Sequence, residues 1–256
     1  MPLYTTKGVL SSVAEYGQVS VIFSYFVLFN VVLAYGMETA FFRFFNKEDE
    51  KNQVVGTSTI SLIITSFGFF ILALIFQNQI AFFIDIDVKY INLVIWILLL
   101  DALSIIPFAW LRATQRPMRY AFIKILNVII NLGFNLFFLL VLKNLASKVT
   151  FFESIYRPNF EISYIFIANL IASGITLLIV VPFYVKTKYV FNKALWKSMM
   201  RYAFPVLVAG IAFSINETFD RILLKELLPP DIADTDIGMY SACYKIALFM
   251  TLFATA

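Results

Sequence analysis

A carboxylate, Asp101, stands near the middle of an apolar stretch that is long enough to cross a membrane as a helix. A charge at mid-bilayer costs roughly 2.5–3.5 kcal/mol on insertion scales, so such a residue calls for a reason. Ser104 follows one helical turn later. Asp101 is therefore predicted to contribute to a cation, proton or polar-substrate site. The alternative is a structural carboxylate that accepts hydrogen bonds from neighbouring hydroxyl groups.

A second polar pattern is a stripe along one face of a later helix. Lys124, Asn127, Asn131 and Asn135 follow one another at intervals of three or four residues, which places them on the same side. Such a stripe can line a hydrated cavity and contact sugar hydroxyl groups, or it can join helices through hydrogen bonds. Three amides and a lysine exceed what helix association usually needs, so we favour the cavity.

Charged residues also lie near the end of the first apolar stretch. Asn30 and Glu38 share one face of it, and Arg43 follows at its inner end. Glu38 and Lys124 both lie about five residues, or ~8 Å, from the same membrane boundary at 1.5 Å per residue. This common depth predicts an ion pair between them. Arg43 is either a cation of the substrate pathway or a side chain that extends to the membrane surface.

A third group, Glu217, Asp220 and Arg221, lies at the outer part of the sixth apolar stretch. Two acids and one arginine within five residues carry excess negative charge. They predict a cation site or an outer gate. The alternative is a self-neutralised helix end that faces water.

Helices in a membrane must position these residues, because the composition excludes a water-soluble protein. Hydrophobic residues make up 61% of the chain and charged residues 14%, against about 45–50% and ~25% in soluble domains. There is no histidine and one cysteine, Cys243, which excludes histidine catalysis, internal disulfides and Cys-rich metal sites. Nucleotide-binding and hydrolase motifs are absent, so we expect no cofactor, no metal and no ATP-driven transport within this chain. The net charge of +4 is attributed to membrane orientation and not to nucleic-acid binding.

Seven stretches are long and apolar enough, or nearly so, to span a bilayer. They predict an all-α polytopic membrane protein with seven transmembrane helices, and a β-barrel is excluded because its strands would alternate in polarity. The predicted spans are Val19–Ala40, Gly56–Phe83, Ile91–Leu111, Ala121–Leu142, Ile162–Tyr184, Tyr202–Leu224 and Ile237–Ala256.

The loops predict the direction of these helices. Lysine and arginine are concentrated around Arg43, Arg112–Arg119 and Lys186–Arg201, whereas the other loops are richer in acids. The positive-inside rule places the basic loops in the cytoplasm and residues 1–16 outside. Because residues 1–16 contain no signal peptide, we expect helices missing before Met1 and after the last span. A complete seven-helix protein is the alternative.

The first and last spans open with similar segments. Glu15–Ser20 and Asp236–Ser241 each place an acid two residues before a glycine, Gly17 or Gly238, and a serine three residues after it. Both segments begin an inward-running helix, with an even number of crossings between them. Such repeats are related by an axis along the membrane normal. We therefore predict an internal repeat.

Several short motifs occur along the chain, and their order and spacing carry a resemblance to a known family. They are Pro2–Thr6 with Glu15–Gly17, Gly36–Phe44, Arg112–Pro117, Arg201–Pro205 and Asp220–Arg221. In this order the chain resembles the polysaccharide-biosynthesis or O-antigen flippases. These are lipid-linked-oligosaccharide translocases of the multidrug/oligosaccharidyl-lipid/polysaccharide exporter superfamily. The resemblance covers essentially the whole chain.

This resemblance implies a two-lobe transporter of about 12–14 helices that works by alternating access and is not an enzyme. Residues 1–190 would hold the N-terminal lobe, from the end of helix 1 to helix 6, and residues 191–256 the start of the C-terminal lobe. The implied substrate is an undecaprenyl-diphosphate-linked oligosaccharide, flipped across the bacterial cytoplasmic (inner) membrane for surface polysaccharide, O-antigen or lipopolysaccharide synthesis. A cationic cavity would receive the diphosphate, with Arg43, Lys124 and Arg221 as candidates.

The acids keep other functions open. Asp101, Glu217 and Asp220 are candidates for coupling to Na⁺ or H⁺, and a cation-coupled multidrug exporter of the same superfamily is the main alternative. A membrane sugar polymerase or ligase would usually need a sizeable outer loop, and a purely structural subunit would not need the polar stripe. Besides the lipid-linked sugar, polysaccharide assembly enzymes are expected partners.

Overall fold

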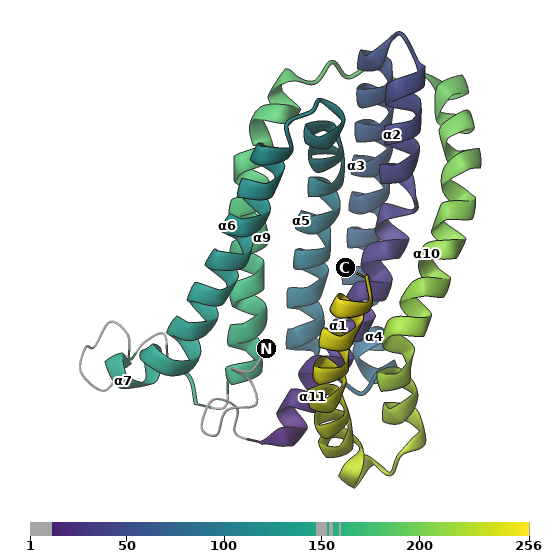
Figure 1. Ribbon diagram of the computed structural model, residues 1–256. Coiled ribbons are helices and arrows are strands. Elements are labelled where there is room, and N and C mark those ends of the chain that lie inside the picture. Colours follow the sequence, from purple (N-terminus) through teal and green to yellow (C-terminus); the bar gives the residue numbers. More distant parts are fainter. Residues whose placement is uncertain (1–11, 147–152, 154–155, 159, 256) are drawn as a thin grey trace. The chain divides into compact units, whose positions relative to one another are not determined.

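The computed structural model describes residues 12–146, 153, 156–158 and 160–255, and these form helices without a strand (Figure 1). The motif Pro2–Thr6, the placement of residues 1–11, much of the loop between Lys143 and Glu161, and Ala256 lie outside the described residues. The helices are α1 (Val13–Ala34), α2 (Met37–Lys47), α3 (Lys51–Ile75), α4 (Gln77–Phe83), α5 (Val88–Ala113), α6 (Pro117–Leu136), the π-helix η2 (Phe137–Val141), α7 (Leu142–Ala146), α9 (Glu161–Lys186), α10 (Lys193–Leu227) and α11 (Pro230–Thr255).

Six of these segments are long and apolar enough to cross a membrane. They are Val13–Lys47, Lys51–Ile75, Val88–Ala113, Pro117–Val141, Glu161–Lys186 and Lys193–Leu227. They correspond to the first six predicted spans. The described part of the seventh predicted span lies in α11, a helix of 26 residues that is not among the six. The chain is an all-α, multi-pass membrane protein.

Two predicted spans are each divided into two helices. Between α1 and α2, Tyr35 and Gly36 adopt left-handed backbone angles, with φ of 34° and 71°. A side chain at Gly36 would also meet the backbone carbonyl of Ala203 in α10, so this turn needs glycine for both reasons. The second break lies at Phe76, between α3 and α4.

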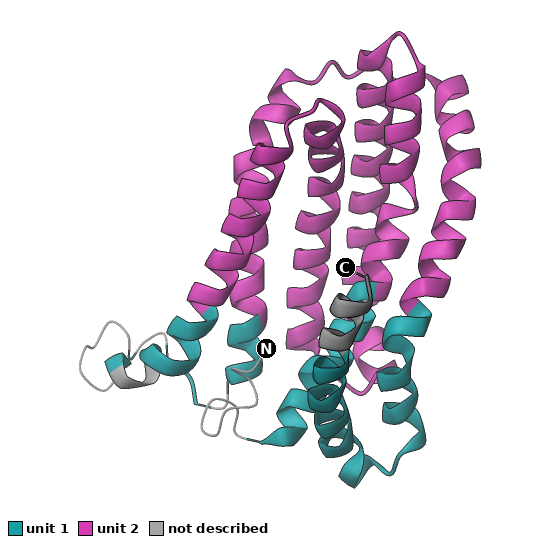
Figure 2. Cartoon of the chain, viewed as in Figure 1, with its two compact units in different colours: residues 1–27, 135–165, 215–256 teal, residues 28–134, 166–214 magenta. Residues whose placement is uncertain are grey.

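The chain divides into two compact units (Figure 2). Unit 1 takes its described residues from 1–27, 135–165 and 215–256, and unit 2 from 28–134 and 166–214. Helices α1, α6, α9 and α10 therefore each contribute to both units. The predicted division into lobes at residue 190 follows a different criterion and stays a prediction.

The core of unit 2 is built on α2. Its side chains Met37 and Phe41 are fully buried, and they pack in one cluster with Ile106 of α5 and Met199 of α10. A second cluster joins α5, α6 and α9 through residues such as Phe108. Close van der Waals packing of such side chains fixes the faces that these helices turn toward one another.

Helix α5 has a well-defined start. The carboxylate of Asp87 accepts a hydrogen bond of 3.0 Å from the backbone N–H of Lys89, as an N-cap does. This hydrogen bond, together with the Lys89 ammonium 3.0 Å away, holds the pKa of Asp87 below its usual range.

Polar contacts join α1, α10 and α11 within unit 1. Asp234 of α11 accepts a hydrogen bond from Gln18 of α1 and forms an ion pair of 2.9 Å with Lys225 of α10. Next to Asp234, α1 and α11 lie in close contact at Gly17 and Gly238.

Candidate functional site

A polar cavity of about 330 Å³ lies within unit 2. Five helices contribute to its wall, and most of the contributing side chains are polar or charged. The lining residues are Asn30 (α1), Glu38 (α2), Asp101, Ser104, Ile105, Phe108 and Arg112 (α5), Tyr120, Lys124 and Asn127 (α6), and Asn169, Ser173 and Thr176 (α9).

Helix α9 supplies three lining residues that the sequence analysis did not single out. Asn169, Ser173 and Thr176 follow at intervals of four and three residues, so they share one face of the helix. The same search for a periodic polar stripe that found Lys124 and Asn127 would have found them. Arg112 was noted only as part of a basic loop, although it lies on the cavity face of α5.

The carboxylate of Asp101 is held by side chains from two other helices. Ser173 donates a hydrogen bond of 2.7 Å to its Oδ1 atom. The side chain of Asn30 is a further hydrogen-bond partner, and Lys124 interacts with the same carboxylate electrostatically. Asp101 therefore sits at the junction of α1, α5, α6 and α9, inside the cavity where the sequence predicted a polar site.

Glu38 forms its ion pair with Arg112. The guanidinium of Arg112 also lies over the rings of Phe42 and Tyr120, each 5.0 Å from the ring centroid. The predicted partner of Glu38 was Lys124, and that pairing is not the one that the structure forms. Glu38 and Lys124 do line the same cavity, so their predicted depth was useful although the pair was wrong.

Lys124 presents a cation to the cavity. Its ammonium lies 4.5 Å from the centroid of the Phe108 ring, and in the described part of the chain no carboxylate lies within 4.0 Å of it. One turn later, the amide of Asn127 donates a hydrogen bond of 2.9 Å to the hydroxyl of Thr176. This end of the predicted stripe is therefore part of the cavity wall.

The structure does not bring all predicted site residues to this cavity. Arg43 is exposed and packs over the ring of Tyr202, 4.4 Å from its centroid. Asn131 is half-buried and Asn135 is fully buried, and neither is among the described lining residues. The predicted stripe on α6 thus divides into a cavity part and a part that makes other contacts.

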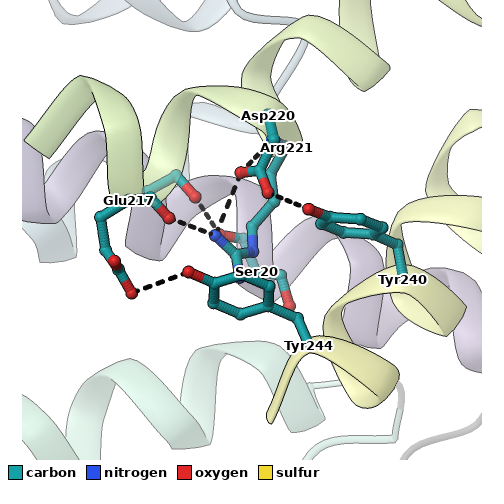
Figure 3. A network of polar contacts seen from close by, with 7 residues as sticks. Ser20, Glu217, Asp220, Arg221, Tyr240 and Tyr244 are labelled. Atoms are coloured by element: carbon teal, nitrogen blue, oxygen red, sulfur yellow. Dashed lines mark hydrogen bonds and ion pairs between the residues drawn. The ribbon is translucent and has the colours of Figure 1, made fainter. Parts of the chain in front are cut away.

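The remaining predicted residues form a separate network in unit 1 (Figure 3). Arg221 donates hydrogen bonds to the carbonyl of Glu217 at 2.9 Å and to the carboxylate of Asp220 at 3.2 Å. Its guanidinium also lies 4.4 Å from the ring centroid of Tyr244. The hydroxyl of Tyr244 donates to Glu217 at 3.0 Å, and that of Tyr240 donates to Asp220.

This network changes the interpretation of the three residues. Arg221 has carboxylate, carbonyl and aromatic partners, and each of the two acids accepts a hydrogen bond from a tyrosine hydroxyl. The contacts connect α10 to α11. These contacts are most simply explained as a structural connection between the two helices. The predicted ion-coupling role of Glu217 and Asp220 stays a prediction.

The cavity of unit 2 is suited to reversible binding. Its amides and hydroxyls can exchange hydrogen bonds with a hydroxylated molecule, and Lys124 can interact with an anionic group. No curated protein and no solved structure shows significant similarity to this chain. The model of one family, described as polysaccharide biosynthesis protein, matches residues 9–256. The chain belongs to this polysaccharide biosynthesis protein family, and its role lies in polysaccharide synthesis or transport.

Proposed function

We propose that this protein flips a polyprenyl-diphosphate-linked oligosaccharide across the bacterial cytoplasmic membrane by alternating access. Members of the family are generally transporters and not enzymes. The observation that carries the proposal is a cavity with polar groups from five helices, inside a chain whose helices are apolar enough to span a membrane. Ionisable residues within membrane-spanning helices are costly, and they mark substrate or ion pathways.

One cation of the cavity, Lys124, is placed to meet an anionic headgroup. Glu38 is neutralised by Arg112, and Asp101 is held by Ser173 and Asn30. Lys124 has the aromatic contact with Phe108 but no carboxylate within ion-pair distance among the described residues. Lys124 is therefore the residue that we assign to the diphosphate. The amides and hydroxyls of α6 and α9 would contact the sugar.

The first test replaces the lysine. Lys124→Gln keeps a polar side chain of similar length and removes the charge. A charge-assisted contact is worth about 1.5–3 kcal/mol, so we expect the flipping rate to fall about tenfold or more. The assay measures the transfer of a fluorescent undecaprenyl-diphosphate oligosaccharide between leaflets of proteoliposomes.

The matched control is Arg43→Gln, which removes an exposed basic residue that does not line the cavity. This variant should flip the probe at the unmodified rate. Equal losses in the two variants, or none in Lys124→Gln, would contradict the assignment of the diphosphate to Lys124.

We further propose that Asp101 couples flipping to a gradient of Na⁺ or H⁺. It lines the same cavity, accepts hydrogen bonds from α9 and α1 and interacts electrostatically with Lys124 of α6, so a change in its charge would alter its interactions with all three helices. Asp101→Asn should make the flipping rate insensitive to an imposed Na⁺ or pH gradient. Ser173→Ala is the control, because it removes a hydrogen bond but keeps the carboxylate. An unchanged gradient response in Asp101→Asn would exclude this residue as the coupling site.

A further inference from the structure

We propose that a second cavity in unit 2 binds an anionic phospholipid, with the phosphate at a cluster of basic side chains and the acyl chains along an apolar wall. This groove has a volume of about 750 Å³ and lies where α5 ends, α6 begins and α9 ends. These three ends lie together at one end of unit 2 (Figure 1). The proposal does not depend on the proposed function.

Four basic residues line the groove. Arg116 directly precedes α6 and Arg119 lies in its first turn, whereas Lys186 ends α9 and Lys188 follows two residues later. All four are exposed. In the described part of the chain no acidic side chain lines the groove, and none of the four forms an ion pair. This differs from the first cavity, where two acids face two bases.

Neighbouring elements hold the chain segments that carry the basic side chains. The guanidinium of Arg116 lies over the ring of Trp110, 5.5 Å from its centroid, and the backbone N–H of Arg116 donates to Leu111. After α9, Asn192 is fastened to α3 by hydrogen bonds to Thr57 and Gln53. The positive charges therefore converge on the groove because both chain segments that carry them are anchored.

The rest of the groove is apolar and accessible. Its wall includes Trp110, Phe122, Ile179 and Phe183. Met118 is 81% exposed and Phe122 is 66% exposed. Among the six segments that could span a membrane, the one that contains α6 is the least buried. These side chains face the place that lipid would occupy.

A phospholipid matches this combination of chemistry. Its phosphodiester can accept hydrogen bonds from arginine and lysine, and its acyl chains can cover the apolar side chains below. A free anion would leave that apolar wall without a partner, and a neutral lipid would leave four cations without one. The basic loops are those predicted to be cytoplasmic, where anionic lipids make the membrane surface negative.

The test compares two quadruple variants of the purified protein. Lipid bound after reconstitution in mixed phosphatidylglycerol and phosphatidylcholine is measured by native mass spectrometry. The groove variant replaces all four basic residues by glutamine. The control removes the same charge from exposed positions of α2 and α10 that do not line the groove. The groove substitutions are Arg116→Gln, Arg119→Gln, Lys186→Gln and Lys188→Gln, and the control substitutions are Lys47→Gln, Lys193→Gln, Lys197→Gln and Arg201→Gln.

We expect the unmodified protein to retain phosphatidylglycerol in preference to phosphatidylcholine. The groove variant should lose this preference, with a fall of about tenfold or more in retained phosphatidylglycerol, while the control keeps it. An equal fall in both variants would overturn the proposal, because it would show that general surface charge attracts the lipid. Displacement of the lipid by inorganic phosphate would also overturn it, since the groove would then be a simple anion site.

A third outcome concerns the substrate lipid. If an undecaprenyl-diphosphate probe displaces phosphatidylglycerol from the unmodified protein at equal lipid amounts, the groove belongs to the substrate pathway and the phospholipid proposal is wrong. The Lys124→Gln variant separates this test from that of the proposed function. Its groove residues are intact, so it should retain phosphatidylglycerol normally even where flipping fails.

Discussion

Glu38 forms its ion pair with Arg112, whereas the sequence predicted a pair with Lys124. Depth along a helix can be counted from the sequence, and the depth predicted for Glu38 and Lys124 does bring both to one cavity. The rotation of each helix about its axis cannot be counted in this way, because it depends on packing between helices. Here the cluster of Phe108, Leu111, Ile123 and Val180 sets the rotation of α5, α6 and α9.

The ion pair of Glu38 can be tested by reversing charges. Glu38→Arg or Arg112→Glu alone places like charges together and should lower the thermal midpoint of the purified protein. The double reversal should restore part of this loss, with a coupling energy of about 0.5–1 kcal/mol for a pair that is only partly buried. The control double variant, Glu38→Arg with Lys124→Glu, should show no such rescue. Rescue in the control instead would favour the pair suggested by the sequence.

At the scale of helices, hydropathy predicted where the chain crosses the membrane but not where helices break. The first six predicted spans each coincide with a segment able to cross a membrane. The break at Tyr35 and Gly36 lies inside a predicted span, because a single glycine in an apolar run is compatible with a continuous helix. The close approach of Gly36 to Ala203, which is distant in the sequence, leaves room for glycine alone at this turn. No local pattern reveals such a contact.

The polar stripe on α6 shows the same limit. Periodicity predicted that Lys124 and Asn127 share one face of the helix, and both line the cavity. It could not show that Asn135, two turns further, is fully buried and belongs to unit 1. Polar residues at helical spacing are predicted to point to the same side of the helix. What they meet there changes along a helix of 20 residues, because the neighbouring elements change along its length. Element-level patterns therefore identify candidate faces, and the packing of other helices decides what each face meets.

At the scale of the whole molecule, the repeated segments at Gly17 and Gly238 lie against each other within unit 1. A side chain at Gly17 would meet the backbone of Asp234, one turn before Gly238, and would lie 3.1 Å from the Gly238 nitrogen. A side chain at Gly238 would meet the backbone of Val13, one turn before Gly17. The contact is reciprocal, as expected where two equivalent helices meet at a two-fold axis. The predicted repeat would account for this reciprocity, and it stays a prediction.

This reciprocity predicts how alanine substitutions behave. Gly17→Ala and Gly238→Ala each force α1 and α11 apart, since the nearest atoms belong to the backbone, and each should cost about 1–3 kcal/mol. Because the first substitution already separates the helices, the double variant should cost less than the sum. Thermal unfolding of the purified protein measures all three.

Gly68→Ala and Gly133→Ala are the controls, because an added methyl group there meets nothing within 4 Å, and helix propensity should make them neutral or stabilising by up to ~1 kcal/mol. Strictly additive costs at Gly17 and Gly238 would mean that the two glycines act at independent contacts, and would count against the predicted repeat.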